Sequence, residues 1–331
     1  MQVTSKKNDH LKYLKPFLLF IVLSSSQTLL AQCFPEWSHK STVTINNTLN
    51  KDTLTDYNVL VTLNTRLLIK FKEMKKDAGD IRFSDLSCNV LPHYIESGVN
   101  TATTKIWVKV PEIPANESID IWLAYGNPAA LNSSNGANTF PFFDDFNIPP
   151  INFSSCGDPA LNMQKGKLTM SWSSAGLVSI ISQTTFPASE VYTGEMKVAS
   201  TNSSYPAIGW YSTKDGTGYS LFANNNYAAI GKSNTSTGSQ YCYPIDFASN
   251  NAEASNSRGI WSITWITTQA IVGEFPTIQS PIYSIDGTYK HDHELVLVAG
   301  TVGNGPGELA LDWVRARKYT NPEPVVSITK N

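Results

Sequence analysis

The sequence predicts an all-β protein built from two antiparallel β-sandwich domains. Three observations support this fold class: apolar and polar residues alternate with period two over many short segments, helical periodicity is nearly absent, and turns rich in Gly, Asn and Ser separate the segments. The chain has 331 residues, of which 41% are hydrophobic and 16% are charged. This length and composition suffice for two domains with a core each.

The first 31 residues are predicted to be a secretory signal peptide. Four lysines precede the apolar segment 17–23, and a run of small and polar residues leads to Ala31, after which cleavage is expected. The apolar run is shorter than the roughly 20 residues that cross a bilayer, so a retained membrane anchor is the less favoured alternative. No transmembrane segment is expected after removal of the signal.

The charge balance argues against a nucleic-acid partner. Signal removal takes four lysines and one aspartate from 25 basic and 27 acidic residues, which leaves a net charge of about −5. The mature sequence has no basic run that could follow a phosphate backbone.

Four cysteines remain after signal removal, and an exported chain can oxidise them. Two lie in each half, so Cys33–Cys88 and Cys156–Cys242 is the simplest of the three pairings. An alternative is that "LAQC" is a lipoprotein signal and Cys33 carries a lipid. Gln32 stands where such signals usually have a small residue, and lipidation would leave Cys88 without its partner.

In the first half, the alternation places a stripe of aliphatic residues on one face of each strand. The stripe comprises Val43, Ile45, Ile81, Phe83, Ile106, Val108, Val110, Ile119, Ile121 and Leu123. This pattern is typical of a half-buried antiparallel sheet. Segment 65–79 is the exception: its apolar residues Leu67, Leu68, Phe71 and Met74 have helical spacing, which predicts one short helix ended by Gly79.

The segment 131–139, "LNSSNGANT", is predicted to be a loop between two domains because its residues favour turns. At least nine short strands follow it, which predicts a jelly-roll sandwich. The expected organisation is a signal peptide at 1–31, a first sandwich at 32–143 and a second at 144–331.

Six segments resemble one known family in their order and spacing: "FPEWSHKSTVTINN", "LTDYNVLVTLNT", "DIRFSD", "LPHYIES", "KIWVKVPEIP" and "IWLAYGNPAA". They are similar to the extracellular module DUF2341, a domain of unknown function, over about residues 34–143. In that family "FFDDF" often follows, and then a concanavalin A-like lectin/glucanase sandwich, which residues 144–320 resemble. The resemblance implies no catalytic residues.

The sequence gives little support for an enzyme. Glycosidases of the concanavalin A-like type commonly carry Glu-x-Asp-x-x-Glu on one strand, and this motif is absent. Glu117 and Asp120 lack the final Glu, and Glu195 stands alone. No Gly-x-Ser-x-Gly nucleophile elbow is present either. A polysaccharide-degrading enzyme with an unrecognised site is therefore the less favoured functional hypothesis.

One pair of aspartates and one pair of histidines are candidate metal ligands. Asp144 and Asp145 are adjacent, so on a strand they point to opposite faces, and we expect one to cap a turn or to pair with the basic segment 315–318. A structural calcium site is the alternative, and no other cofactor is expected. His291 and His293 have spacing that suits a metal pair, but a polar turn is the preferred interpretation.

Aromatic and charged residues on the faces opposite the aliphatic stripe are the candidate carbohydrate site. Sugar rings stack on flat aromatic side chains while their hydroxyls take directional hydrogen bonds. The candidates are Trp107, Trp122, Tyr94, Arg82 and Glu96 in the first domain and Trp210 and Tyr211 in the second. The alternative is that a second sheet or the neighbouring domain covers these residues.

The preferred function is that of a secreted or cell-surface binding or adhesion protein of bacterial type, without catalytic activity and with a carbohydrate ligand. The alternatives are the polysaccharide-degrading enzyme and a structural component of a surface complex. The expected partners are accordingly a polysaccharide or other surface proteins.

Overall fold

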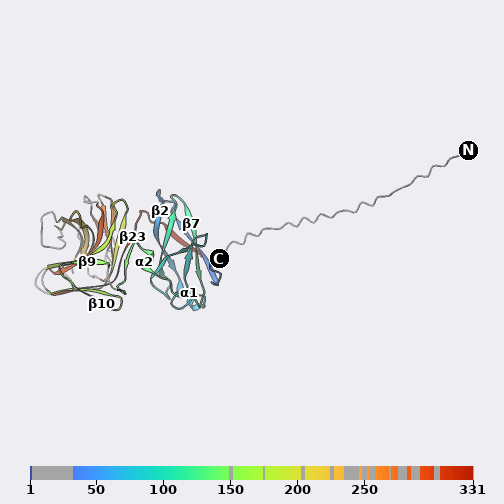
Figure 1. Cartoon of the computed structure of the whole chain (residues 1–331), viewed down its shortest axis with the longest axis horizontal. Coiled ribbons are helices and arrows are strands. Elements are labelled where there is room, and N and C mark those ends of the chain that lie inside the picture. Colours follow the sequence, from blue (N-terminus) through green and yellow to red (C-terminus); the bar gives the residue numbers. More distant parts are fainter. Residues whose placement is uncertain are drawn as a thin grey trace. The chain divides into compact units, whose positions relative to one another are not determined.

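A computed structural model describes Met1 and residues 33–148, 152–173, 176–202, 206–223, 227–234, 246–247, 252–253, 258–267, 270–274, 282–284, 291–301 and 306–330. Residues Cys33–Asn331 form one compact unit, separate from Met1–Gln32. Figure 1 shows the strands of this unit. Nearly all of the expected signal peptide lies outside the described residues.

The first sandwich consists of two antiparallel sheets, with the strand orders β24-β1-β7-β3-β4 and β2-β6-β5. Its strands are β1 (His39–Asn46), β2 (Leu54–Leu63), β3 (Arg82–Ser84), β4 (Val90–Leu91), β5 (His93–Ser97), β6 (Thr104–Ile113), β7 (Ser118–Tyr125) and β24 (Val325–Lys330). The predicted aliphatic stripe lies in one core between the sheets, where Ile119 is partly buried and the other nine side chains are buried. The alternation therefore identified the inner face of β1, β3, β6 and β7 correctly.

The predicted helix forms, but it is shorter and oriented differently from expectation. Helix α1 covers Thr65–Lys70, and the Asn64 side chain accepts a hydrogen bond from the Leu67 N–H at its start. The helix ends because Lys72 has a φ of 60°, in the left-handed region. Leu67 and Phe71 were expected on the core face, yet 46% and 65% of their surface is exposed.

The second sandwich consists of two eight-stranded antiparallel sheets. One has the order β10-β11-β23-β13-β19-β20-β21, with β8 beside β23; the other has the order β17-β16-β15-β14-β22-β12-β9, with β18 beside β16. The strands of the first are β8 (Phe142–Asp144), β10 (Ala160–Met163), β11 (Leu168–Trp172), β13 (Tyr192–Thr201), β19 (Gly259–Thr267), β20 (Ala270–Glu274), β21 (Ile282–Ser284) and β23 (Gly307–Lys318). Those of the second are β9 (Phe153–Cys156), β12 (Gly176–Phe186), β14 (Ala207–Ser212), β15 (Thr217–Ala223), β16 (Tyr227–Asn234), β17 (Asp246–Phe247), β18 (Ala252–Glu253) and β22 (His293–Thr301).

A single core fills the space between these two sheets. Met170 and Leu311 enter it from one sheet, and Trp210, Leu221 and Leu297 enter it from the other. The indole of Trp210 is fully buried and donates to the carbonyl of Ile263 at 3.1 Å. The predicted all-β class with two antiparallel sandwiches is confirmed.

The last strand of the chain, β24, belongs to the first sandwich and not to the second. After β23, a segment with a cis peptide at Asn321–Pro322 leads back to the first sandwich, where β24 pairs with β1. Val326 and Ile328 pack against the first core. This differs from the expected second domain at 144–331, because the inward side chains of β24 contact the first core. The loop after β7 contains the short helix α2 (Gly136–Thr139).

The predicted disulfide between Cys33 and Cys88 is present and links the segment before β1 to the turn after β3. A sulfur in this bond is not available for the lipid that was the alternative for Cys33. The second predicted bond, Cys156–Cys242, ends on a residue outside the described part of the chain. Within the described residues, no helix has the length and apolar character needed to cross a bilayer.

Candidate functional site

The two sandwiches meet along a seam between the outer face of β5 and β6 and the outer face of β13 and β23. Four aromatic side chains fill it, from β6, the loop with α2, β8 and β23: Trp107, Phe140, Phe143 and Trp313. Tyr94 packs on Phe143 with ring centroids 4.7 Å apart. All four of the aromatic residues are less than 10% exposed, so the seam is a third, aromatic core.

Alternation along β23 directs Trp313, Arg315 and Arg317 to this seam. The strand register puts Arg315 opposite Glu195 of β13, and Glu195 opposite Ser262 of β19. On the other side, a register shift in β5 lies at Glu96, and such bulges re-aim a side chain. The local backbone thus presents two acids and two guanidinium groups to one buried layer.

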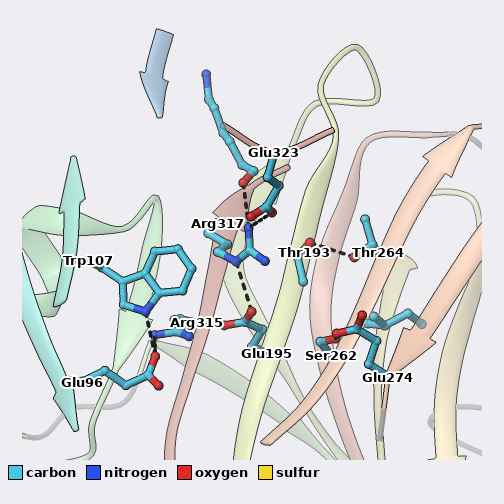
Figure 2. Close-up of polar contacts among 12 residues, drawn as sticks. Glu96, Trp107, Thr193, Glu195, Ser262, Thr264, Glu274, Arg315, Arg317 and Glu323 are labelled. Atoms are coloured by element: carbon cyan, nitrogen blue, oxygen red, sulfur yellow. Dashed lines mark hydrogen bonds and ion pairs between the residues drawn. The ribbon is translucent and has the colours of Figure 1, made fainter. Parts of the chain in front are cut away.

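These groups form a buried ion-pair network, which Figure 2 shows. Arg315 Nη1 lies 2.7 Å from Glu96 Oε2, in contact range but without directional hydrogen-bond geometry, and Arg315 Nε donates to Glu195. Arg317 Nε donates to Glu195 Oε1 at 3.1 Å, and its Nη1 donates to Glu323 at 2.5 Å. The Trp107 N–H donates to Glu96 Oε2 at 2.7 Å.

Electrostatics keep Glu195 and Arg317 ionised. Burial raises the pKa of Glu195, but the charges of Arg315 and Arg317 and their hydrogen bonds outweigh it, so the pKa is lowered overall. Burial lowers the pKa of Arg317, yet Glu195 and Glu323 raise it above its usual value. Desolvation raises the pKa of Tyr94 to about 12. A carboxylate held in this way is poorly suited to proton transfer near neutral pH.

Three of the predicted carbohydrate-binding residues, Trp107, Tyr94 and Glu96, come together, but inside the seam. Trp107 is 5% exposed, and the Glu96 side chain is 4% exposed. Arg315 lies over the Trp107 ring at 4.8 Å. The face that the sequence suggested for a ligand is therefore occupied by the second sandwich, which was the alternative interpretation.

The two candidates in the second domain are also inaccessible. Trp210 is fully buried in the core of the second sandwich, and Tyr211 is 7% exposed in a cluster on the other side of β14. Neither ring presents a free face to a sugar. Period-two alternation could not reveal this, because β14 is buried on both faces.

The remaining two candidates lie away from the seam. Trp122 is half-buried on the outer face of β7, and the Lys40 ammonium stands 3.9 Å above its ring. Arg82 donates to the carbonyls of Gly79, Ile81 and Leu131, so its guanidinium ties a loop to β3.

Within the acidic pair and within the histidine pair, the two side chains lie in different environments. Asp144 is 8% exposed, its oxygens accept the N–H groups of Phe146 and Asn152, and burial raises its pKa. Asp145 accepts the Asn147 N–H at 3.2 Å. His293 is buried and His291 is exposed. In the described part of the chain, no three His, Cys, Asp or Glu residues are grouped as metal ligands.

A groove of about 350 Å³ opens at the end of the seam, between the start of β2 and the segment that follows β23. We call it the seam groove. Its walls combine hydroxyl, amide and charged groups with a few apolar side chains: Asp52, Thr53, Leu54, Thr55, Tyr57, Glu190, Val191, Ile266, Lys318, Tyr319, Thr320 and Asn321. Such a volume lies within the range of small-ligand sites.

The charged wall of the groove is held rigidly. Lys318 Nζ lies 3.0 Å from Glu190 Oε2, and the Tyr192 hydroxyl donates to the same carboxylate. Burial raises the pKa of Glu190, but the hydrogen bonds from Tyr192 and Lys318 outweigh this effect, so the pKa is lowered overall. Glu190 therefore remains an acceptor at neutral pH.

The Tyr57 side chain, which also lines the groove, has a buried hydroxyl without a hydrogen-bond acceptor. It is 2% exposed, and its hydroxyl makes no hydrogen bond of ordinary geometry with any described residue. The backbone N–H of Thr320 lies beside its oxygen, so the hydroxyl proton is the part that lacks an acceptor. Desolvation raises the pKa of Tyr57, so the proton stays in place. A buried donor without an acceptor costs about 1–3 kcal/mol unless a ligand satisfies it.

Sequence reasoning missed the groove. Tyr57 lies in "YNVLVTL", where it reads as one more strand residue, and the opposite wall is about 260 residues further along the chain. The only local signal was the polar, turn-forming composition of both segments.

Several solved structures similar to this chain have names of carbohydrate-active proteins. One is described as "Prominent members of the human gut microbiota express endo-acting O-glycanases to initiate mucin breakdown", with 12% identity over 55% of this chain and 100% of that chain and a TM-score of 0.39. LamAcat from Zobellia galactanivorans is 13% identical over 54% of this chain and 98% of its own, with a TM-score of 0.38. A lichenase from a mouse hindgut metagenome is 11% identical over 54% and 99%, with a TM-score of 0.37.

These identities and TM-scores assign no activity or ligand to this chain. No curated protein matches the sequence. A family model does match it, and the matched segment overlaps the expected module from β3 to α2 and continues past β9. Over residues 77–159 the chain matches the model described as "Domain of unknown function (DUF2341)", and the protein thus carries a DUF2341 domain.

Proposed function

We propose that this protein is an exported, non-catalytic carbohydrate-binding protein and that the seam groove is its binding site. The observation that carries the proposal is the polar groove itself, which is lined in part by Tyr57, whose covered hydroxyl has no acceptor among the described residues. A sugar that displaces the atoms covering this hydroxyl could accept its proton. The export itself is inferred from the signal-like residues 1–31 and agrees with the Cys33–Cys88 disulfide.

The mixture of groups in the groove supports a polyhydroxylated ligand. Thr53, Thr55 and Asn321 offer donors and acceptors, while Leu54 and Ile266 offer apolar surface for the C–H faces of a sugar ring. Lys318 and Glu190 neutralise each other, so the groove has no strong attraction for an anionic ligand. These properties favour a neutral sugar over a charged metabolite.

Binding is favoured over hydrolysis by the state of Glu195. This residue was the candidate carboxylate of the enzymatic alternative, and the structure places it between Arg315 and Arg317 in the buried network. Its lowered pKa makes it a weak base, and its oxygens are already occupied.

The test is a panel of soluble polysaccharides and a glycan array, applied to residues 33–331 with folding verified by near-UV circular dichroism. We expect binding of at least one neutral glycan. Thr55→Trp, which fills the groove from an exposed position, should abolish it, and Tyr57→Phe should weaken it about fivefold, the value of one ordinary hydrogen bond.

Trp122→Ala is the matched control, because it removes the half-exposed aromatic candidate outside the groove. We expect this variant to bind like the wild type. The proposal would be overturned if the folded protein bound no glycan, or if Trp122→Ala lost binding while Thr55→Trp retained it.

A further inference from the structure

The end of the first sandwich at α1 carries exposed apolar and basic side chains together. We define the α1 surface as Leu67 and Phe71 with the four cations Arg66, Lys70, Lys72 and Lys76, all exposed. The apolar residues are one helical turn apart, because the Phe71 N–H donates to the Leu67 carbonyl. The sequence pattern suggested that both would enter the core.

The core has no room for these residues because others already fill their place. Met74 is buried in the first core, and Leu68 and Ile69 pack against it from α1. The left-handed turn at Lys72 then ends the helix, so Leu67 and Phe71 remain outside. Two large apolar side chains kept in water lose the free energy that burial would give them, about 1.5–3 kcal/mol each when burial is complete.

The cations of the α1 surface lack carboxylate partners among the described residues. Glu73, an acid of the same segment, is already bonded to Lys330 Nζ at 2.9 Å, and this bond lowers the pKa of Glu73. Asp77 accepts the backbone N–H of Gly79. The surface is therefore positive in a chain whose formal net charge is −2.

We propose that the α1 surface docks on a bilayer that contains anionic phospholipids. Cations near such a surface are attracted to the phosphate groups, and apolar side chains between them enter the boundary between headgroups and acyl chains. A soluble polyanion would match the cations but would leave Phe71 and Leu67 in water. The combination of both kinds of side chain selects the lipid surface.

The experiment uses residues 33–331, which form a compact unit without the apolar N-terminal segment that would itself bind lipid. Sedimentation with vesicles of phosphatidylcholine and phosphatidylglycerol (70:30) is compared with pure phosphatidylcholine. We expect binding to the anionic vesicles only, weakened by high salt. Lys70→Gln/Lys72→Gln should lower the partition coefficient about 25-fold, about fivefold for each charge.

Phe71→Ser should also lower binding to anionic vesicles, and because Phe71 is 65% exposed the substitution removes little buried surface. Lys165→Gln/Lys214→Gln is the matched control, because it removes two exposed lysines from the second sandwich and should bind like the wild type. Equal binding to both vesicle types, or unchanged binding of the Lys70→Gln/Lys72→Gln variant, would overturn the proposal. So would retention on heparin beads together with no binding to anionic vesicles, or full binding by Phe71→Ser.

Discussion

Arg315 and Glu96 join the two sandwiches: Arg315 Nη1 on β23 lies 2.7 Å from Glu96 Oε2 on β5, and their side chains are 2% and 4% exposed. The guanidinium carbon also lies 4.8 Å from the ring centroid of Trp107 and 4.5 Å from that of Trp313. The seam thus combines charge pairing with aromatic packing in a layer that excludes water. A contact of this kind fixes how one sandwich meets the other, because neither partner can leave without exposing an unpaired charge.

Removing Arg315 should be strongly destabilising. In Arg315→Met, Glu96 remains buried without a cation and Glu195 keeps only Arg317, and breaking such a buried pair typically costs about 3–5 kcal/mol. The free energy of unfolding from urea titration measures this loss. Lys109→Met is the matched control, because it breaks the exposed pair with Asp56 and should cost less than about 1 kcal/mol. Equal losses in the two variants would contradict a buried network.

Gly136 is required at the start of α2 for packing of the seam. A Cβ at this position would stand 2.4 Å from the ring of Phe143. Gly136→Ala should therefore displace this ring and cost about 1–3 kcal/mol of unfolding free energy, as overpacked sites do. Asn138→Ala, on the exposed side of the same helix, should change stability by less than about 0.5 kcal/mol. A Gly136→Ala variant as stable as the wild type would show that the seam can repack.

The Cys33–Cys88 bond closes a loop with a sequence separation of 55. Removing it with Cys33→Ser/Cys88→Ser should lower the free energy of unfolding by about 4 kcal/mol in the chain-entropy description of cross-links. Thermal and urea unfolding of the variant without reductant measure the effect of this bond alone. A variant within about 0.5 kcal/mol of the wild type would indicate that the linked segments are equally restricted in the unfolded state.

His93 should make stability depend on pH. It is 4% exposed and packs on Phe83, and burial, together with the charge of Arg82, lowers the pKa of His93 from 6.5 to about 4. The unfolded chain therefore binds the proton first as the pH falls. The stabilisation is complete above pH 6.5 and is lost between pH 6.5 and 4, by about 3 kcal/mol for this group.

Urea unfolding at several pH values measures this effect, and His93→Phe isolates it from the carboxylates that titrate in acid. The variant should lose less stability than the wild type between pH 7 and 4. Parallel profiles for the two proteins would contradict the lowered pKa.

Much of the fold could be read from the sequence, because each strand records which of its faces is apolar. Val43, Ile45 and Phe83 alternate with polar neighbours, and all are buried as expected. The Cys33–Cys88 bond followed from the number and distribution of the cysteines. The helix at α1 was recognised as helical, but its orientation was wrong because spacing alone does not show which residues the core has room for.

Little of the candidate functional site could be predicted from the sequence. Trp107 and Glu96 were recognised as a group, yet period two shows only that they share the second face of a sheet, not what covers that face. Glu195 looked like a lone acid, and its partner Arg315 is 120 residues away. Tyr57 gave no signal, since an unpaired hydroxyl exists only once the chain around it is folded.

The sequence by itself determined the all-β class, the inner face of β1, β3, β6 and β7 in the first sandwich, the likeness to DUF2341 and one disulfide. These depend on local alternation and on residue types, which any strand carries along its own length. Only the tertiary structure decided that the aromatic face is a seam, that β24 returns to the first sandwich, and that a polar groove opens at the end of the seam. Each of these requires surfaces far apart in the chain to meet, and the free energy of that contact depends on how they fit together.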